Sequence, residues 1–285
     1  MFESVALATA LIGSSLAAAW DLRTTEIPDQ IPHAMIVAAL LLYALQSYTQ
    51  WSYLPILYSL IAGLSLLGFG FLMYYLGQWG GGDAKILAAI GFLLPLQHSS
   101  TRLLFPFPLS YLINVFLVGA VYMLGYAAVL AAKNKRILTA FKSDIKASSS
   151  VFIVGSFALF GLFLAVNFYL ANYFHIHFGP MLFVNALLPS VATVALFLVW
   201  KFAKAVENVG FKKRIPVSKL RVGDVLLKSK LWEGITEKEL RAIRRSKKSH
   251  VWIKEGVRFA PAFPLALLFT LYLGDAFLVF VKLLI

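Results

Sequence analysis

The sequence predicts an all-α polytopic membrane protein of about eight transmembrane helices, one of them short, with a small α+β cytoplasmic domain before the last helix. Of the 285 residues, 60% are hydrophobic and 14% are charged. The mean hydropathy is +0.79. This composition excludes an ordinary soluble globular protein. The absence of cysteine excludes disulfides, thiolate metal sites and a cysteine nucleophile.

Apolar stretches set the expected helices. Seven of them are long enough to span a bilayer, at residues 2–20, 31–48, 54–76, 107–132, 151–174, 180–202 and 259–284. An eighth stretch, 84–97, is short and contains Pro95, so its length alone leaves open whether it crosses or re-enters the membrane.

The distribution of basic residues favours eight crossings. If the N-terminus is outside, the inside segments hold 24 of the 26 Lys and Arg residues, and they are 21–30, 77–85, 133–148 and 201–258. This is a strong positive-inside pattern. No basic residue precedes the first apolar stretch, which is therefore expected to remain as a helix instead of being a cleaved signal. The sequence thus predicts a multi-pass protein of the cell membrane.

Three parts are expected along the chain. Residues 1–200 form a transmembrane helical domain, 201–258 a small basic cytoplasmic domain, and 259–285 the final transmembrane helix. In the middle part, 222–227 is typical of a turn leading into a strand, Thr236 begins a capping box that opens a short helix, and 251–253 suits a second strand.

The small domain carries 17 Lys and Arg residues against 6 Asp and Glu residues, a net charge of +11. Such a surface is expected to bind anionic lipid headgroups. Ordinary positive-inside topology explains the charge equally well. Nucleic-acid binding is not predicted, because no recognition motif accompanies the basic residues.

Two acids are the candidate catalytic residues. Asp21 ends the first apolar run, and Asp83 directly follows three glycines. With eight crossings both acids lie at the cytoplasmic edge, where two carboxylates could activate a water against a peptide bond. Taken singly, Asp21 could be an ordinary interfacial residue and Asp83 a helix cap. No histidine spacing suits a metal, and no cofactor site is predicted.

Neighbouring residues are expected to support the two acids. Gly80, Gly81 and Gly82 have no side chains, so an extended substrate backbone could approach closely there. Lys85 and Arg23 are candidates for stabilising the ionised form of either acid.

The chain resembles the archaeal prepilin and preflagellin peptidases, which are membrane aspartic proteases with a GxGD motif. Four segments carry the resemblance: Trp20-Asp21-Leu22-Arg23 through Glu26-Ile27-Pro28-Asp29, Gly80-Gly81-Gly82-Asp83-Ala84-Lys85, Pro106-Phe107-Pro108 with Asn114, and Lys254-Glu255-Gly256-Val257-Arg258-Phe259-Ala260-Pro261. The resemblance implies removal of a short basic leader, on the cytoplasmic side, from pilin-like or archaellin precursors. Two stretches, 151–174 and 180–202, depart from the family pattern as an extra helix pair, and nothing in the sequence supports N-methyltransfer.

An ion-coupled or proton-coupled transporter or channel using the same acids is the alternative. Both acids are predicted at one membrane edge, whereas transport sites lie near the midplane between repeats, and the chain has no internal repeat. If the protein is a peptidase, the net charge of 201–258 repels a basic leader. We therefore expect the acids of the site to recognise the basic leader. Reversing the charges of Lys247 and Lys248 should then leave cleavage intact.

Overall fold

A computed structural model describes residues 2–97, 103–175, 179–229, 234–246, 249–276 and 278–279. Lys247 and Lys248, named in the sequence analysis, lie outside the described residues. Clustering of contacts divides the chain into two units, Met1–Gly125 with Lys213–Ile285, and Tyr126–Lys212. Each unit is described by itself, and the predicted three-part division stays a prediction.

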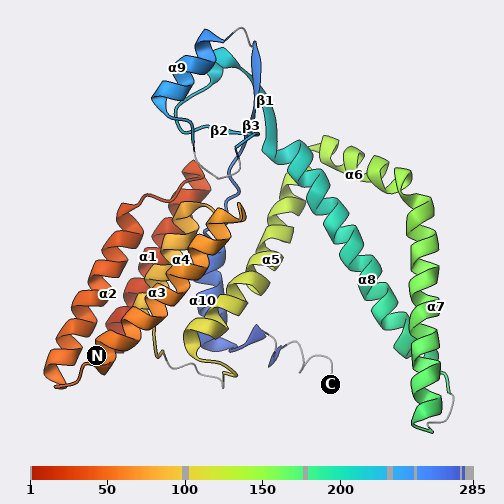
Figure 1. Cartoon of the computed structure of the whole chain (residues 1–285), viewed down its shortest axis with the longest axis horizontal. Coiled ribbons are helices and arrows are strands. Elements are labelled where there is room, and N and C mark those ends of the chain that lie inside the picture. The colour runs from red at the N-terminus through yellow and green to blue at the C-terminus, as the bar shows by residue number, and fades with distance from the viewer. Residues whose placement is uncertain are drawn as a thin grey trace. The chain divides into compact units, whose positions relative to one another are not determined.

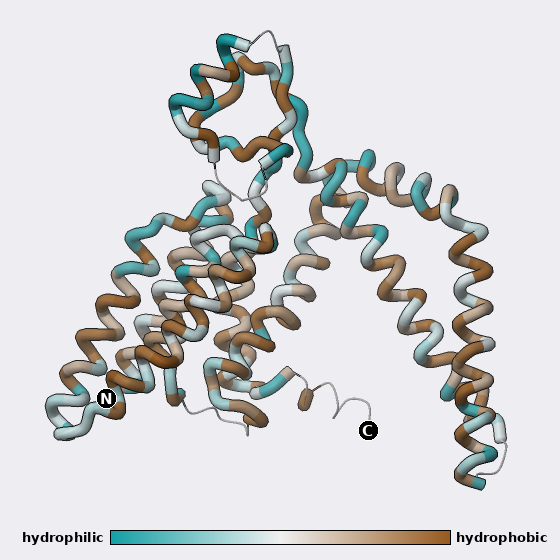
Figure 2. The backbone as a smooth tube through the Cα atoms, viewed as in Figure 1, coloured by the Kyte–Doolittle hydropathy of each residue, from teal (hydrophilic) through white to brown (hydrophobic). Residues whose placement is uncertain are grey.

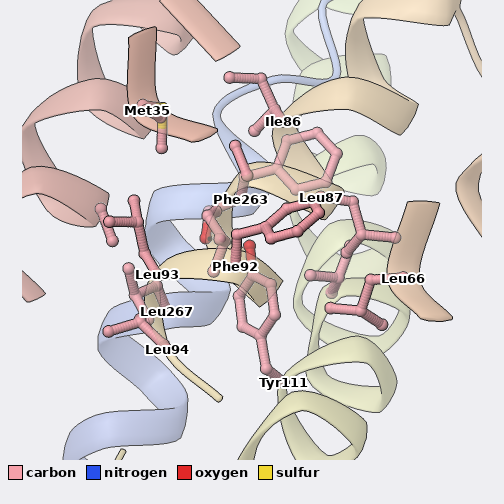
Figure 3. Packing of buried hydrophobic residues seen from close by; sticks show 14 of the residues in the cluster. Met35, Leu66, Ile86, Leu87, Phe92, Leu93, Leu94, Tyr111, Phe263 and Leu267 are labelled. Atoms are coloured by element: carbon pink, nitrogen blue, oxygen red, sulfur yellow. Dashed lines mark hydrogen bonds between the residues drawn. The ribbon is translucent and has the colours of Figure 1, made fainter. Parts of the chain in front are cut away.

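The first unit contains a helical core. Its helices are α1 (Phe2–Thr24), α2 (Gln30–Thr49), α3 (Leu54–Tyr75), α4 (Gly81–Leu93), the first part of α5 (Phe107–Lys133) and α10 (Ala262–Tyr272). α4 packs against α1, α2 and α3, and α10 packs against α1 (Figure 1). Side chains from α2 to α5 and from α10 interlock around α4, among them Met35, Leu87, Tyr111 and Phe263 (Figure 3).

Close approach of α3 explains why the short α4 is so deeply buried. A Cβ at Gly63 would lie 2.2 Å from the ring of Phe92, and one at Gly70 would lie 2.8 Å from the Cα of Ala84. Small residues at such crossings let helix backbones pack closely in membranes. Glycine at these two positions therefore allows α4 to lie against α3.

α4 ends inside the core, where its last carbonyl groups need hydrogen-bond donors. The hydroxyl of Ser59 on α3 donates to the Phe92 carbonyl at 2.7 Å, and the hydroxyl of Tyr43 on α2 donates to the Leu93 carbonyl at 2.6 Å. Both side chains are buried. A 13-residue helix is stable at this place because its neighbours satisfy its C-terminal end.

α5 and α10 are joined by polar contacts in the first unit. The Asn114 amide donates to the Thr270 hydroxyl at 2.9 Å and to the Gly274 carbonyl at 2.8 Å, and its oxygen accepts the Ala276 N–H at 2.9 Å. Asn114 thus joins α5 to α10 and the segment that follows it. Asp275, also buried, accepts the N–H of Leu104.

The final helix is shorter than predicted. The sequence indicated one run over 259–284, but α10 begins at Ala262 and ends at Tyr272. Gly274 has a φ of +80°, a left-handed conformation that interrupts the helix. Residues 277 and 280–285 lie outside the described part of the chain.

The small domain is a three-stranded sheet with a helix. Its strands are β1 (Lys212–Pro216), β2 (Val225–Leu226) and β3 (His250–Lys254) in the order β1-β3-β2, and β2 pairs antiparallel with β3. The single-turn 3₁₀ helix η2 spans Val217–Lys219, and α9 spans Glu237–Arg245. Leu220, Ile235 and Leu240 form the core.

The predictions for this domain were largely right. Both predicted strands are present, and the Thr236 capping box opens α9, with the Thr236 hydroxyl and the Glu239 carboxylate each accepting the other's backbone N–H. β1 was missed, because Lys-Lys-Arg-Ile-Pro has no apolar alternation.

The second unit comprises the end of α5, α6 (Lys135–Ala147), α7 (Ser149–Tyr173), α8 (Met181–Val206) and a π-helical turn, η1 (Glu207–Phe211). α8 pairs with α7 and contacts α6. Most of the inside segment 133–148 of the sequence analysis is the helix α6. Ile137 is buried with Ala127 and Val206, whereas Lys135 and Arg136 are exposed, so an apolar stripe at helical spacing stabilises the helix.

In the described part of the chain, six helices are long and apolar enough to cross a membrane, and they are α1, α2, α3, α5, α7 and α8, the last taken with η1. The predicted count of about eight is not confirmed, because α4 and α10 have only 13 and 11 residues. Hydrophobic residues run along the six long helices, and hydrophilic residues gather in the small domain and in α6 (Figure 2). The protein is a multi-pass membrane protein with a mostly helical fold.

Candidate active site

Asp21 lies in the last turn of α1 and is held by a distant part of the chain. Its side chain is only 4% exposed, and Oδ2 accepts the backbone N–H of Ala260 at 2.9 Å. Ala260 directly precedes Pro261, the N-cap residue of α10. The positive charge of Arg258 also acts on the Asp21 carboxylate. The segment 258–260 therefore fixes the position and the electrostatic environment of Asp21.

Asp83 lies in the first turn of α4. Its Oδ2 accepts the N–H of Gly80 at 3.0 Å, the reverse half of a capping box. The capping role considered as an alternative is thus present. It involves one carboxylate oxygen, and it orients the side chain without excluding a role in catalysis.

Both acids line one cavity of about 720 Å³ in the first unit. Its other walls include residues 24–27 at the end of α1, residues 78–82 at the start of α4, and residues 221–225 and 253–257 of the small domain. Cavities of this size enclose ligands as large as a few amino-acid residues. Residues separated by 62 positions in the chain thus share one chamber, closed on one side by the sheet domain.

Charge in the cavity is mixed and mainly acidic. Besides Asp21 and Asp83, the lining acids are Glu26, Asp224 and Glu255, against the bases Arg221 and Lys254. Glu255 forms an ion pair with Lys213 at 2.6 Å, and Asp224 accepts the Arg221 N–H at 2.7 Å. Glu26 is exposed, with its Oε1 3.7 Å from the position of a Cβ at Gly223.

The pKa of the Asp83 carboxyl lies well above its ordinary value. Burial raises the pKa of the Asp83 carboxyl to about 7, the nearby Asp21 carboxylate raises it further, and the hydrogen bond from Gly80 opposes the rise. Asp83 lies outside the six long apolar helices. A carboxyl group poised near neutral pH can either hold or release a proton there, which suits acid–base chemistry.

The three glycines all line the cavity, but they differ in their surroundings. A Cβ at Gly82 would lie 2.8 Å from the Cβ of Ile27, so this position needs glycine for packing. At Gly81 the nearest atom, on Tyr74, would be 3.9 Å away. Gly81 therefore leaves free space for another backbone, as the predicted substrate approach requires.

The structure does not bring the two predicted supporting bases to the acids. Lys85 forms an ion pair with Asp29 at 2.7 Å, and Arg23 is exposed. Neither residue lines the cavity. The supporting charge next to Asp21 comes instead from Arg258, at the other end of the sequence.

Sequence reasoning missed Arg258, Ala260 and Glu26 as parts of the site. Arg258 and Ala260 had a signal, because both belong to the 254–261 motif on which the resemblance partly rested. Glu26 likewise lies in the quoted segment after Asp21. Within the described ranges no group of three or more His, Asp or Glu residues is arranged to hold a metal ion.

Part of the chain is similar to known proteins. Residues 8–124 match the type IV leader peptidase family. The resemblance read from the motifs is thereby confirmed for this segment, which contains Asp21, Asp83 and the three glycines. The 254–261 motif lies outside the segment that matches the leader peptidase family.

Three similar proteins carry related names. A preflagellin peptidase of Methanococcus voltae is 34% identical over 140 residues, 46% of this chain and 58% of the relative. Prepilin peptidase EppA of Methanothermobacter thermautotrophicus is 25% identical over 48% of this chain and 39% of the relative. A preflagellin peptidase of Methanocaldococcus jannaschii is 31% identical over 30% and 36%, respectively. The matched parts span between about a third and three-fifths of these relatives.

Proposed function

We propose that the protein is a membrane aspartic endopeptidase that removes the short basic leader from type IV pilin-like or archaellin precursors. The observation that carries the proposal is that Asp21 and Asp83, from two different helices, line the same cavity of about 720 Å³. The leader peptidase family match over 8–124 and the names of the three relatives support the same reaction.

The two carboxyl groups would act as general base and general acid. One is ionised and takes a proton from a water molecule, which attacks the carbonyl carbon of the scissile peptide bond. The other is protonated, polarises that carbonyl and later donates a proton to the leaving amine. We assign the proton preferentially to Asp83, whose pKa is raised to about 7 by burial. Asp21, whose Oδ2 accepts the Ala260 N–H, then acts as the base.

The cavity also suits the proposed substrate. Free space at Gly81 lets an extended backbone approach the acids, and a peptide must be extended for its scissile bond to be reached. Glu26 offers a negative charge to a basic leader residue. The acids of the cavity, and not the basic surface of the small domain, are the groups that fit a basic leader.

Topology completes the proposal. The N-terminus lies outside, and the site and residues 201–258 lie at the cytoplasmic face, as the distribution of basic residues favours. The basic surface of that domain lies against anionic headgroups. The alternative of a transporter is not favoured, because Asp21 and Asp83 lie at helix ends next to a sheet domain.

Single substitutions test the pair of acids. Asp21→Asn and Asp83→Asn should each reduce cleavage of a tagged prepilin in membranes by about 10²-fold or more, because each removes one acid–base group. The measurement is the initial rate of leader release.

Asp29→Asn is the matched control, since Asp29 is exposed, pairs with Lys85 and does not line the cavity. It should cleave at the wild-type rate. Full activity of either Asp21→Asn or Asp83→Asn would remove that residue from the mechanism.

A further inference from the structure

The segment 25–27, which directly follows α1, is tied to Asp21 by its backbone. The N–H of Thr25 donates to the Asp21 carbonyl at 2.8 Å. The Thr24 hydroxyl donates to the Glu26 carbonyl at 3.0 Å and so closes the turn. Residues 25–27 all line the cavity of the two acids. The position of this segment is therefore set by the end of the helix that carries Asp21.

The same segment contacts the start of α4. Ile27 is partly buried and packs against the hydrophobic core. A Cβ at Gly82 would lie 2.8 Å from the Cβ of Ile27, 3.3 Å from its Cδ1 and 3.4 Å from its Cγ1. Gly82 directly precedes Asp83. The Ile27 side chain thus fills the space beside the backbone that carries Asp83.

A strained turn fixes Ile27 relative to Asp21. Thr25 has a φ of +62°, a left-handed conformation that β-branched residues rarely adopt. Gly256, which follows β3, packs against this turn, because a Cβ there would lie 3.3 Å from the Thr25 carbonyl oxygen. A strained conformation persists only where the surrounding structure holds it. The turn therefore has little freedom to move Ile27 away from Gly82.

We propose that Ile27 is a positioning residue, which sets the separation of the Asp21 and Asp83 carboxyl groups through its contact with Gly82. The catalytic consequence rests on the proposed function. Both carboxyl groups must reach the same scissile bond, and misplacing a catalytic group by about 1 Å can slow a reaction by about 10²-fold. Closely packed contacts transmit such displacements, because they contain no free space to absorb them. The Ile27 side chain is thus suited to hold the two acids at one distance.

Cross-linking measures the separation without an assay of activity. The chain has no cysteine, so a variant with Asp21→Cys and Asp83→Cys contains two thiols only. The ratio of cross-linking yields with a short and a long bifunctional thiol reagent reports their separation. Adding Gly82→Ala should lower this short-to-long ratio by about threefold or more, because the new methyl group pushes Gly82 away from Ile27. Adding Ile27→Gly as well should restore the ratio, since it removes the three nearest atoms.

Gly81→Ala is the matched control for the cross-linking, because the nearest atom to a Cβ there is 3.9 Å away, and the ratio should not change. Ile27→Gly without Gly82→Ala is a second variant, which decides the question if Gly82→Ala does not fold. It should raise the ratio, because Gly82 can then approach the turn. An unchanged ratio in either folded variant contradicts the proposal. A loss in Gly82→Ala that Ile27→Gly does not reverse also contradicts it.

The rate of cleavage gives the catalytic consequence. On a short soluble peptide, containing the leader and the first residues after the scissile bond, Gly82→Ala should lower kcat by about tenfold or more with little change in KM. Adding Ile27→Gly should restore most of kcat. Gly68→Ala on α3 is the control, because Gly68 does not line the cavity and no described atom beyond its own helix backbone lies within 4 Å of a Cβ there.

The remaining outcomes separate this proposal from the proposed function. A rise in KM with an unchanged kcat would assign Ile27 to substrate binding and overturn its positioning role. If the wild type does not cleave the peptide but the cross-linking ratios change as expected, the proposed function fails, while the separation set by Ile27 stands.

Discussion

Asp21 and Asp83 reach the cavity from the C-terminal end of one helix and the N-terminal end of another. One carboxylate oxygen of Asp21 accepts the backbone N–H of Ala260, and one of Asp83 accepts the backbone N–H of Gly80. These bonds orient the side chains and leave the second oxygens for other contacts. Burial of Asp83 next to Asp21 makes ionisation of both groups at once unfavourable.

We expect cleavage to fall as the pH rises through about 7. The proton on the pair, which we assign mainly to Asp83, is then lost, and with it the general acid, so the rate should decline about tenfold per pH unit. The measurement is the pH dependence of kcat/KM on the short soluble peptide. A rate that stays constant from about pH 6 to 9 would contradict the assignment.

The same shift has a consequence for stability. The folded protein binds the Asp83 proton more tightly than the unfolded chain, whose pKa is near 3.8. The contribution of Asp83 to the free energy of unfolding is therefore fully present below pH 3.8 and is lost as the pH rises to about 7.

At the scale of elements, two short helices position the site. α4 depends on Ser59 and Tyr43 for its C-terminal end. α10 begins two residues after Ala260, whose backbone N–H bonds to Asp21. Neither helix has the length expected of a simple membrane crossing. Their lengths are set by neighbouring helices that supply hydrogen bonds.

Asn114→Leu tests the connection between α5 and α10. The substitution leaves the Gly274 carbonyl and the Ala276 N–H without their partner, so the free energy of unfolding should fall by about 1–2 kcal/mol. Denaturation in detergent measures the loss. Asn167→Leu is the control, because the Asn167 amide bonds only to the Phe163 carbonyl of its own helix, and equal loss in both variants would contradict the prediction.

For the whole molecule, the charge of the small domain and the charge of the cavity have opposite signs. The segment 201–258 has a net charge of +11, whereas the cavity has five acids and two bases. If the protein acts on basic leaders as we propose, the cavity attracts a leader and the outer surface of the domain repels it. On the same proposal, the surface charge serves lipid binding and the cavity charge serves substrate binding.

Reversing the charges of Lys247 and Lys248 to Glu should leave cleavage of a short peptide at the wild-type rate. Binding to vesicles rich in anionic lipid should weaken, since each basic residue near the surface contributes about 1 kcal/mol. Co-sedimentation with vesicles and the peptide assay give the two readouts. Abolished cleavage with an intact fold would show that the basic surface, and not the cavity, recognises the leader.

Much of the fold could be predicted from local patterns. Six of the seven long apolar runs became long helices, and the Thr236 capping box and the strands at 225–226 and 250–254 followed from turn and cap chemistry. The break at Gly274 and the helix α6 were not predicted, because an apolar run does not reveal where it bends, and an amphipathic segment with many bases resembles a loop.

The sequence by itself determined the membrane class, the two candidate acids and the family resemblance, because composition and the motif around Asp83 are local properties. Only the tertiary structure decided which residues surround those acids. In the folded chain Asp21 accepts a hydrogen bond from Ala260 and feels the positive charge of Arg258, whereas Lys85 forms an ion pair with Asp29. The physical reason is that the environment of a buried carboxylate is made by backbone groups and charges from distant segments, and their positions follow from helix packing.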